Sequence, residues 1–501
     1  MFESANLEHK VDKAAYKCEV ANLREALLHA QLELKDRGRF PVLILIAGVE
    51  GAGKGETVNL LNEWMDSRYI STSVFFEPTE EESERPAAWR FWRALPPKGR
   101  IGVFFGAWHT MPVIQRVTGE ISEGEFARQI SEIVRLEKML CDEGVLLLKY
   151  WFHLSKPQQK RRFRELEKNP LTRWRVTERE WEYFKSYAKF IRVCEPFLRK
   201  TSMGEAPWIV IPAAEPRYRA LTVGRHLLAA ISDRLKDGTA QTLPVHTPPL
   251  ALPVDQLNPL RALKLDQPMT KDRYKTELAK WQGRLNAAAR DPRFQALAVV
   301  AVFEGNDAAG KGGALRRVTG ALDARSYQSF PVAAPTEEER AQPYLWRFWR
   351  QLPRRGRFAF FDRSWYGRVL VERVEKFCAE ADWHRAYVEI NDFEQALARH
   401  HMVVVKFWLA ISKEEQLRRF QLRAKTAFKQ FKITKEDWRN RKQWDAYEHA
   451  VCDMVDHTST SLAPWTLVEA NNKYHARIKV LRTLCLAVEA ALGTVKPPRK
   501  K

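Results

Sequence analysis

The stretch Leu297-Ala-Val-Val-Ala-Val-Phe303, followed by Gly305-Asn-Asp-Ala-Ala-Gly310-Lys311-Gly312-Gly313, decides which fold this chain can adopt. Its first part is a continuous apolar run, which is typical of a central strand in a parallel sheet. The G-x-x-x-x-G-K pattern behind it predicts a loop whose backbone N–H groups and lysine surround a phosphate at a helix N-terminus. We therefore expect a phosphate-binding loop formed by Gly305, Gly310, Lys311, Gly312 and Gly313.

The chain contains this unit twice. The loop recurs as Gly48-Val-Glu-Gly-Ala-Gly53-Lys54-Gly55, so position 305 corresponds to position 48, a displacement of 257 positions. The same displacement relates Trp346-Arg-Phe-Trp-Arg350 to Trp89-Arg-Phe-Trp-Arg93 without a gap. A repeat of this length is a whole domain and not a solenoid unit. The sequence therefore predicts a duplicated and fused domain.

Proline content separates the two repeats. Residues 238–270 contain six prolines. Because proline is excluded from helix interiors and central strands, this segment predicts a stiff, extended linker. We therefore predict three parts: an N-terminal domain at residues 1–237, a linker at 238–270 and a C-terminal domain at 271–501.

Apolar runs and stretches of helical spacing alternate along each repeat. Strands are expected at Val42–Ala47, Leu297–Phe303, Phe358–Phe361 and Val403–Leu409, and a helix at about residues 383–399. Beyond Ser412 the pattern is polar, basic and helical to about Asp456. This alternation predicts the α/β class, with two tandem three-layer α/β/α domains.

Composition limits the class of protein and the partner. The 501 residues include 83 Lys and Arg against 62 Asp and Glu, a net charge of +21, which favours a polyanionic partner. No apolar run is long enough to span a bilayer, and the first residues lack the pattern of a secretory signal. Six widely spaced cysteines without a CxxC pair argue against a zinc site or a disulfide scaffold. We therefore expect a cytoplasmic protein with no membrane partner.

The phosphate loop lacks the hydroxyl residue that usually follows its lysine and binds magnesium. Gly312 occupies that position in the second repeat and Gly55 in the first. Another group must then hold the metal. Asp307 lies inside the loop, and Asp362 follows the apolar run that ends at Phe361. A carboxylate at the end of a strand beside the phosphate loop is where a P-loop enzyme places a magnesium ligand.

The two repeats differ at the charged positions. Both keep the loop lysine, Lys311 and Lys54, but other charged groups of the second repeat are replaced in the first: Asp307 by Glu50, Asp362 by Phe105, Arg363 by Gly106, Glu372 by Gln115 and Arg423 by Leu166. Phosphoryl transfer depends on positioned charge. We therefore predict a degenerate, inactive N-terminal domain and a catalytic C-terminal domain.

Four motifs of the second repeat resemble those of the family-2 polyphosphate kinases. They are Glu304-Gly-Asn-Asp-Ala-Ala-Gly-Lys-Gly-Gly313, Phe361-Asp-Arg-Ser-Trp-Tyr-Gly-Arg368, Val371-Glu-Arg-Val374 and Leu462-Ala-Pro-Trp465. The resemblance implies a P-loop kinase core with a helical lid in each domain. The two-copy arrangement is similar to the subclass that phosphorylates AMP to ADP from inorganic polyphosphate, by in-line transfer without a covalent intermediate.

The resemblance also implies roles for individual residues. Lys311 matches the phosphate-loop lysine, Asp307 and Asp362 match the carboxylates that hold Mg²⁺, and a usual Asn in the Ser-Trp-Tyr motif is Gly367 here. The implied catalytic residues are Asp307, Lys311, Asp362, Arg363, Glu372 and Arg423. Further phosphate contacts are expected from Arg368, Arg418 and Arg419.

Two other functions stay open at this point. An ATP-dependent nucleotide kinase would share the loop, the lid and the arginines, although one ATP needs no long basic track. A P-loop nucleic-acid-binding protein would suit the basic helices, but no helix-turn-helix, RRM, zinc-finger or helicase-type acidic motif is present in the sequence. The sequence does not decide between AMP and GMP as the acceptor, and it does not decide whether the protein forms a homo-oligomer.

Overall fold

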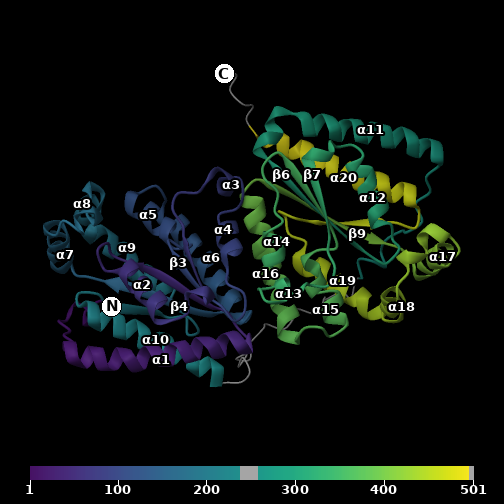
Figure 1. Cartoon of the computed structure of the whole chain (residues 1–501). Helices are drawn as coiled ribbons and strands as arrows, with labels where there is room; N and C mark the ends of the chain where they lie inside the picture. The colour runs from purple at the N-terminus through teal and green to yellow at the C-terminus, as the bar shows by residue number, and fades with distance from the viewer. Residues whose placement is uncertain (237–257, 496–501) are drawn as a thin grey trace. The chain divides into compact units, whose positions relative to one another are not determined.

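The structure, a computed structural model, describes residues 1–236 and 258–495 (Figure 1). Its residues group into two compact units. The first comprises Met1–Pro78, residues 90–236 and Pro335–Trp346, and the second comprises Thr79–Trp89, residues 258–334 and residues 347–495. Each unit thus consists mainly of one repeat. Residues 238–257 of the predicted linker lie outside the described residues, so the predicted domain boundaries stay a prediction.

Each unit is built on a parallel sheet of five strands. The first sheet has the order β2-β3-β1-β4-β5 and the second the order β10-β9-β6-β8-β7, which is the same order from the opposite edge. The strands are β1 Val42–Gly48, β2 Ile70–Val74, β3 Ile101–Phe105, β4 Leu146–His153, β5 Trp208–Pro212, β6 Ala298–Gly305, β7 Tyr327–Pro331, β8 Arg357–Asp362, β9 Met402–Ala410 and β10 Trp465–Glu469. The predicted strands and the α/β class are confirmed.

Helices connect the strands of both repeats. In the first repeat they are α1 Lys13–Arg37, α2 Lys54–Trp64, α3 Glu80–Ser83, α4 Trp89–Ala94, α5 Thr110–Thr118, α6 Glu123–Asp142, α7 Lys156–Lys168, α8 Glu178–Lys185, α9 Tyr187–Lys200 and α10 Pro216–Lys236. In the second they are α11 Lys271–Arg290, α12 Lys311–Thr319, α13 Glu337–Arg340, α14 Trp346–Trp349, α15 Val371–Val374, α16 Glu380–Arg399, α17 Lys413–Ala424, α18 Lys435–Lys442, α19 Trp444–Thr458 and α20 Lys473–Thr494. The predicted helix at 383–399 is α16.

Helices cover both faces of each sheet. In the second unit α11, α12 and α20 lie on one face, and α16 and α19 lie on the other (Figure 1). The apolar side chains of β6 and β9 are buried between these layers, as their continuous apolar sequences predict. The segment beyond Ser412 forms α17, a 3₁₀ turn at Ala427–Lys432, α18 and α19. It corresponds to the helical lid expected from the resemblance.

The order of the strands fixes where a ligand can bind in the second unit. β6 is the central strand and pairs with β8 on one side and β9 on the other. Phe303 stands opposite Asp362, and Gly305 stands opposite Leu409. Parallel α/β sheets bind ligands beyond the carboxyl ends of such strands. The phosphate loop, which follows β6, lies at this edge.

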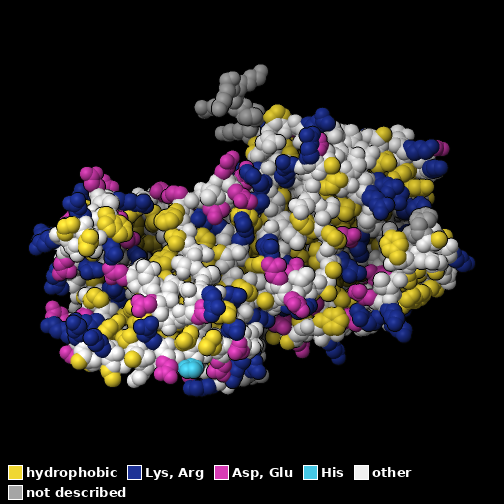
Figure 2. Space-filling view, in the orientation of Figure 1, with side chains coloured by type: hydrophobic (Ala, Val, Ile, Leu, Met, Phe, Trp, Pro, Cys, Tyr) yellow, Lys and Arg dark blue, Asp and Glu magenta, His cyan; other side chains and the backbone are white. Residues whose placement is uncertain are grey.

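Charge alone does not locate a binding site on the surface. Figure 2 shows Lys and Arg side chains scattered over both units on the visible face, with Asp and Glu side chains between them. Among the described residues, no helix is long and apolar enough to cross a membrane. The position of a polyanion site must therefore be established from the pocket and its side chains.

Candidate active site

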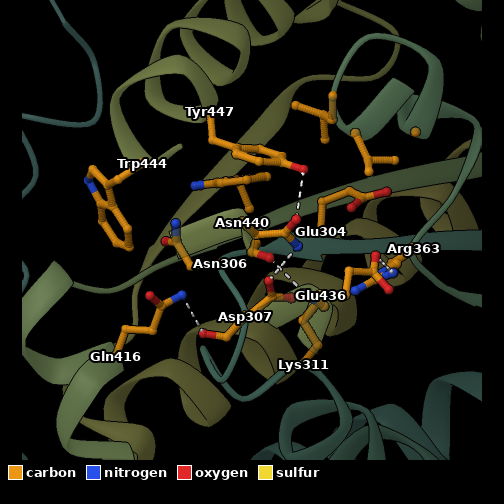
Figure 3. A pocket seen from close by; sticks show the side chains of 15 residues that line it. Glu304, Asn306, Asp307, Lys311, Arg363, Gln416, Glu436, Asn440, Trp444 and Tyr447 are labelled. Atoms are coloured by element: carbon orange, nitrogen blue, oxygen red, sulfur yellow. Dashed lines mark hydrogen bonds and ion pairs between the residues drawn. The ribbon is translucent and has the colours of Figure 1, made fainter. Parts of the chain in front are cut away.

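A pocket opens beside the phosphate loop of the second unit (Figure 3). Its lining comes from β6, the loop, the segment after β8, β9 and the lid helices: Glu304, Gly305, Asn306, Asp307, Lys311, Arg363, Gly367, Leu370, Val371, Trp408, Gln416, Glu436, Asn440, Trp444 and Tyr447. Four predicted site residues, Gly305, Asp307, Lys311 and Arg363, are among them. The repeat that keeps its charged residues therefore brings the loop and the lid to one cavity.

The phosphate loop owes its shape to glycines in two positions. Gly305 has a φ of 145°, and a Cβ placed on it would lie 2.4 Å from the carbonyl oxygen of Leu409. Gly310 has a φ of 108° and caps α12, which begins at Lys311. Both conformations are rare for residues with a side chain. The first backbone N–H groups of α12 consequently remain available to a phosphate at this end of the helix.

Lys311 and Asp307 have different partners within the loop. The Nζ of Lys311 donates to the carbonyl oxygen of Gly305 at 2.6 Å. The Asp307 carboxylate accepts from the Nδ2 of Asn440 at 2.8 Å and from an Arg363 guanidinium nitrogen at 3.4 Å. Gln416 donates to the main-chain oxygen of Asp307 at 3.1 Å. Asp307 thus joins the loop to the lid and to the end of β8.

The segment after β8 carries Asp362, Arg363 and Ser364. Arg363 adopts the left-handed conformation, with a φ of 64°, where the first repeat has Gly106 with a φ of 68°. A non-glycine residue in this region is strained and commonly belongs to a functional site. Its guanidinium lies between the carboxylates of Asp307 at 3.4 Å and Glu436 at 3.6 Å. This strained arginine is therefore directed into the pocket.

Glu304 is a buried acid beside the loop lysine. Its carboxylate accepts a hydrogen bond from the hydroxyl of Ser364 at 2.8 Å, and only 5% of the residue is exposed. Burial raises the pKa of Glu304, and the negative charge of Asp362 acts in the same direction, whereas Lys311 opposes them. Asp362 lies opposite Phe303, the neighbour of Glu304 in β6, but it does not itself line the pocket.

A buried network holds the segment after β8 in position. Trp365 and Tyr366 donate to the carboxylate of Glu394 on α16 at 3.0 and 2.7 Å. Lys406 of β9, fully buried, donates to Glu394 at 2.7 Å and to the carbonyl oxygen of Thr458 at 2.8 Å. The pairing satisfies a buried charge, as an ion pair in the interior requires. The Asp-Arg-Ser-Trp-Tyr motif is therefore anchored at its aromatic end.

Several lid residues of the pocket were not predicted from the sequence. Asn440 lies between Asp307 and Tyr447, whose hydroxyl donates to the Oδ1 of Asn440 at 3.2 Å (Figure 3). Glu436 pairs with Arg363. The repeat carried a signal for both, because the corresponding residues of the first repeat are Tyr183 and Arg179. Glu304, which corresponds to Ala47, could have been found in the same way.

Other predicted site residues lie away from the pocket lining. Arg368 and Glu372 pair with each other at 2.9 Å, and Arg418 pairs with Glu415 at 2.7 Å. Arg423 is half-buried near the end of α17, and its charge acts on Asp437. Gly312 faces open space, and Gly313 lies near Arg477. Arg419 contacts the loop itself but from outside the pocket, as described below.

Comparison with known proteins identifies the family. The family model described as polyphosphate kinase 2 (PPK2) matches residues 10–239 and 268–496, so both repeats match it. The chain belongs to the polyphosphate kinase 2 family. The family resemblance predicted from the four motifs is therefore confirmed.

Individual relatives extend over nearly the whole chain. A polyphosphate:AMP phosphotransferase of Pseudomonas aeruginosa is 57% identical over 98% of this chain and 99% of that protein. A second protein of that name, from Pseudomonas syringae pv. tomato, is 53% identical over 99% of this chain and 100% of its own length. The crystal structure of a protein assigned as polyphosphate kinase 2 from Pseudomonas aeruginosa aligns with a TM-score of 0.88, at 55% identity, over 98% of this chain and 99% of that one. Their similarity covers both units.

The pocket has few side chains that could bind the Mg²⁺ ion expected for a polyphosphate kinase. Among the described residues, no group of three or more His, Cys, Asp or Glu side chains is arranged to hold a metal ion. Magnesium in kinases needs only one or two carboxylates, because phosphates and water complete its octahedron. Asp307, with 13% of its side chain exposed, and Asp362 at the end of β8 fit this mode of binding.

Proposed function

We propose that this chain transfers the terminal phosphoryl group of inorganic polyphosphate to AMP, giving ADP, and that the reaction is reversible. The observation that carries the proposal is the convergence of Lys311, Asp307 and Arg363 at the carboxyl edge of one sheet only. Phosphoryl transfer is catalysed mainly by positioned positive charge and metal-binding carboxylates. The names of the long relatives agree with this reaction.

We assign a role to each charged residue of the site. Lys311 and the N–H groups at the start of α12 bind the oxygens of the transferring phosphate. Arg363 neutralises charge that develops on it. The role of Arg423 on α17 as a lid arginine rests on the family resemblance, since this residue lies away from the pocket lining. Glu372 holds Arg368 by their ion pair. Mg²⁺, held by Asp307 and Asp362, would supply further positive charge to the phosphate oxygens.

The acceptor needs no strong general base. The phosphate of AMP is ionised at neutral pH, so it can attack without losing a proton to the protein. The aromatic rings of Trp408, Trp444 and Tyr447 line the same pocket and offer faces for a nucleobase. We assign this reaction to the C-terminal unit alone. A cytoplasmic location agrees with six free cysteines.

The direct test uses purified full-length protein, Mg²⁺, AMP and long-chain polyphosphate, with no ATP present. We expect ADP to appear, and we expect the Asp362→Asn variant to make none. ATP and AMP without polyphosphate form the second arm. A protein that made no ADP from polyphosphate, or that worked only with ATP, would overturn the proposal in favour of an ATP-dependent nucleotide kinase.

A further inference from the structure

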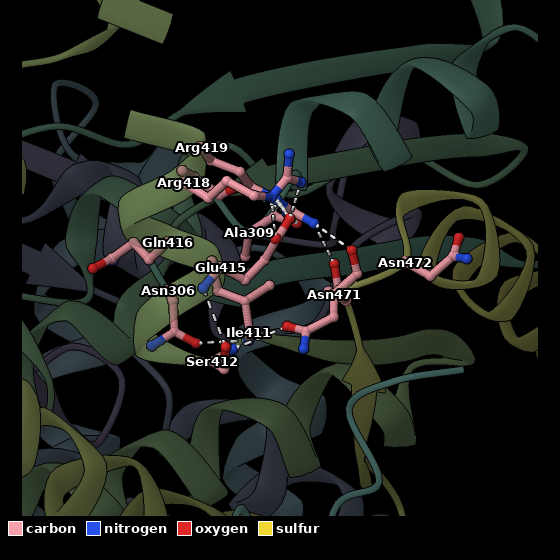
Figure 4. A network of polar contacts seen from close by, with 12 residues as sticks. Asn306, Ala309, Ile411, Ser412, Glu415, Gln416, Arg418, Arg419, Asn471 and Asn472 are labelled. Atoms are coloured by element: carbon pink, nitrogen blue, oxygen red, sulfur yellow. Dashed lines mark hydrogen bonds and ion pairs between the residues drawn. The ribbon is translucent and has the colours of Figure 1, made fainter. Parts of the chain in front are cut away.

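Arg419 of α17 contacts the carbonyl groups of the phosphate loop and does not line the pocket (Figure 4). One guanidinium nitrogen donates to the carbonyl oxygens of Ala308 and Ala309, both at 2.9 Å. The other donates to those of Ala470 and Asn471, at 2.6 and 2.8 Å, in the turn after β10. Arg419 therefore ties the loop to that turn.

The donors of Arg419 are fully used in these contacts. A guanidinium has five N–H donors in a fixed planar arrangement. Four serve the carbonyl oxygens, and the Nε donates to Glu415 at 2.6 Å, which also balances the charge. The side chain is only 14% exposed. Arg419 was predicted from the family resemblance to bind phosphate, but this geometry leaves it no donor for a phosphate oxygen.

The contact to Ala308 has a reason in the backbone. Ala308 has a φ of 64°, a left-handed conformation that costs a residue with a Cβ about 1–2 kcal/mol. The corresponding residue of the first repeat is Gly51, with a φ of 77°, which adopts this conformation without that cost. The hydrogen bond from Arg419 to the Ala308 carbonyl helps to hold the strained residue, and with it the loop.

The first unit makes the same connection with a different arginine. Arg219 of α10 donates to the carbonyl oxygens of Ala52 and Ala213, at 3.4 and 3.3 Å. These two residues correspond to Ala309 and Ala470 at the displacement of 257. The residue that corresponds to Arg419 is Arg162, which instead binds Glu56 at 3.0 Å.

The charge partner has moved together with the arginine. Arg219 pairs with Glu56 at 2.8 Å, whereas the second repeat has Gly313 at that position. Arg419 pairs with Glu415, whereas the first repeat has Gln158 there. A buried guanidinium between these carbonyl groups thus occurs in both units but is supplied from different helices. The first unit lacks the predicted catalytic carboxylates but still has a buried guanidinium that binds these carbonyl groups. We therefore infer that the guanidinium holds the loop in position and does not take part in the chemical step directly.

We propose that Arg419 is a positioning residue, which holds the phosphate loop of the catalytic unit in its binding shape by joining its carbonyl groups to the turn after β10. The proposal rests on the proposed polyphosphate-dependent activity for its kinetic consequences. The loop N–H groups must meet the transferring phosphoryl group, and an error of 1 Å can cost about 10²-fold in rate. Polyphosphate itself touches other groups, so its binding changes less than the rate.

The first experiment compares Arg419→Ala with Arg419→Lys in the full chain. We expect kcat for ADP formation to fall about 10²-fold in both, with the KM for polyphosphate within about threefold of wild type. Lysine keeps the charge but has three donors at one point and cannot span four carbonyl groups. If Arg419→Lys kept nearly the full rate, or if the KM for polyphosphate carried the loss, Arg419 would be a phosphate contact and the proposal would be wrong.

The second experiment moves the guanidinium to the helix that supplies it in the first unit. Ala476 corresponds to Arg219, and Glu415 is retained in the double variant as the partner for the buried charge. Arg419→Ala combined with Ala476→Arg should therefore recover most of the lost rate. A guanidinium on α20 could rebuild the contact to Ala309 and Ala470 without touching the phosphate. If Arg419→Ala alone failed to fold, recovery of folding together with the rate would support the proposal, and recovery of folding without the rate would overturn it.

Hydrogen exchange separates this proposal from the proposed activity. Without substrate, the amides of residues 305–313 should exchange faster in Arg419→Ala and return towards wild type when Ala476→Arg is added. Arg219→Ala is the matched control: exchange should rise in residues 48–56 while ADP formation stays unchanged. Unchanged exchange at 305–313 would overturn the positioning role. If the variants showed these exchange changes but the wild-type protein formed no ADP, only the proposed activity would be overturned.

Discussion

The two glycine-rich loops have similar backbone conformations, but their lysines have different hydrogen-bond partners. In the first unit the Nζ of Lys54 donates to the carbonyl oxygens of Gly48 and Val49, at 3.1 and 3.2 Å, and to the Glu50 carboxylate at 3.2 Å. In the second, Lys311 donates to Gly305, while the acid of the loop, Asp307, is held by Asn440 and Arg363. The first lysine is thus neutralised by its own loop. The lysine is therefore kept in both loops, but only in the first does it pair with the acid of its own loop.

Other buried groups are the same in both units. Lys149 and Glu137 form a fully buried pair at 2.6 Å, and Lys406 and Glu394 form the equivalent pair at 2.7 Å. Trp108 donates to Glu137 as Trp365 does to Glu394, in each case at 3.0 Å. Removing one partner of such a pair would leave an uncompensated buried charge. These residues persist in both repeats because the fold needs them, whereas the charged groups of the pocket do not.

The largest expected effect tests this difference at the lysines. Lys311→Ala should lower the rate of ADP formation at least about 10³-fold, because it removes the main side-chain cation of the phosphate loop. The matched variant Lys54→Ala should leave the rate unchanged, since the ammonium group of Lys54 is already paired with the Glu50 carboxylate. Steady-state assays of both full-length variants measure this. A large loss in Lys54→Ala would mean that the first unit takes part in the reaction.

A smaller effect is expected at Asn440, which links the lid to Asp307. Groups that orient a metal-binding carboxylate typically change metal affinity 10–100-fold when removed. Asn440→Ala should therefore raise the Mg²⁺ concentration for half-maximal rate about 10-fold. Tyr183 corresponds to Asn440 in the first unit, and Tyr183→Ala should leave the Mg²⁺ dependence unchanged. An Asn440→Ala enzyme with a normal Mg²⁺ dependence and a lower rate would assign Asn440 to the lid alone.

Sequence was sufficient for those parts of the site that follow directly from a strand. A continuous apolar run ending in a glycine-rich loop has one common structural solution, so β6 was predicted correctly. Lys311 and Asp307 lie in the loop behind it and line the pocket, and their roles stay a prediction. Asp362 followed from the same rule applied to β8. Comparison of the two repeats also predicted which unit has lost charged residues, because the gapless register aligns Asp362 with Phe105.

Contacts made across the fold could not be predicted in this way. Asn440 meets Asp307 across 133 positions, and nothing in the local pattern of α18 marks it. Arg419 stands in a basic helix next to Arg418, and both were expected to bind phosphate. Only the structure shows that Arg418 is 65% exposed whereas Arg419 is buried against carbonyl groups. The two units also supply the buried guanidinium from different helices, Arg419 from α17 and Arg219 from α10. Neither position alone reveals this difference in the sequence.

The stability of the first unit should depend on Glu56. Burial disfavours its charged form, but Arg219 and Arg162 outweigh this and hold the pKa of Glu56 below its usual value. The charged carboxylate therefore stabilises the fold at neutral pH, and this contribution is lost as the pH falls through the lowered pKa. Glu56→Gln should cost about 2 kcal/mol at neutral pH, with a difference from wild type that shrinks on acidification.

Hydrogen exchange in α2, measured at neutral pH and at about pH 4, reports this loss for the first unit separately. Glu165→Gln is the control, since Glu165 is an exposed acid on neighbouring α7. A difference between Glu56→Gln and wild type that grew on acidification would show that the pKa of Glu56 is raised in the folded protein and not lowered.

The smallest expected effect concerns the left-handed residue of each loop. Ala308→Gly relieves a conformational cost of about 1 kcal/mol but adds about as much chain entropy to the unfolded state, so stability should change by less than about 1 kcal/mol. In the first unit, Gly51→Ala should cost about 1–3 kcal/mol, because its Cβ would also lie 2.7 Å from the ring of Phe163. Denaturant unfolding of the two variants measures both changes. A large loss in Ala308→Gly would mean that the methyl group packs and that strain is not why Arg419 binds two loop carbonyl groups where Arg219 binds one.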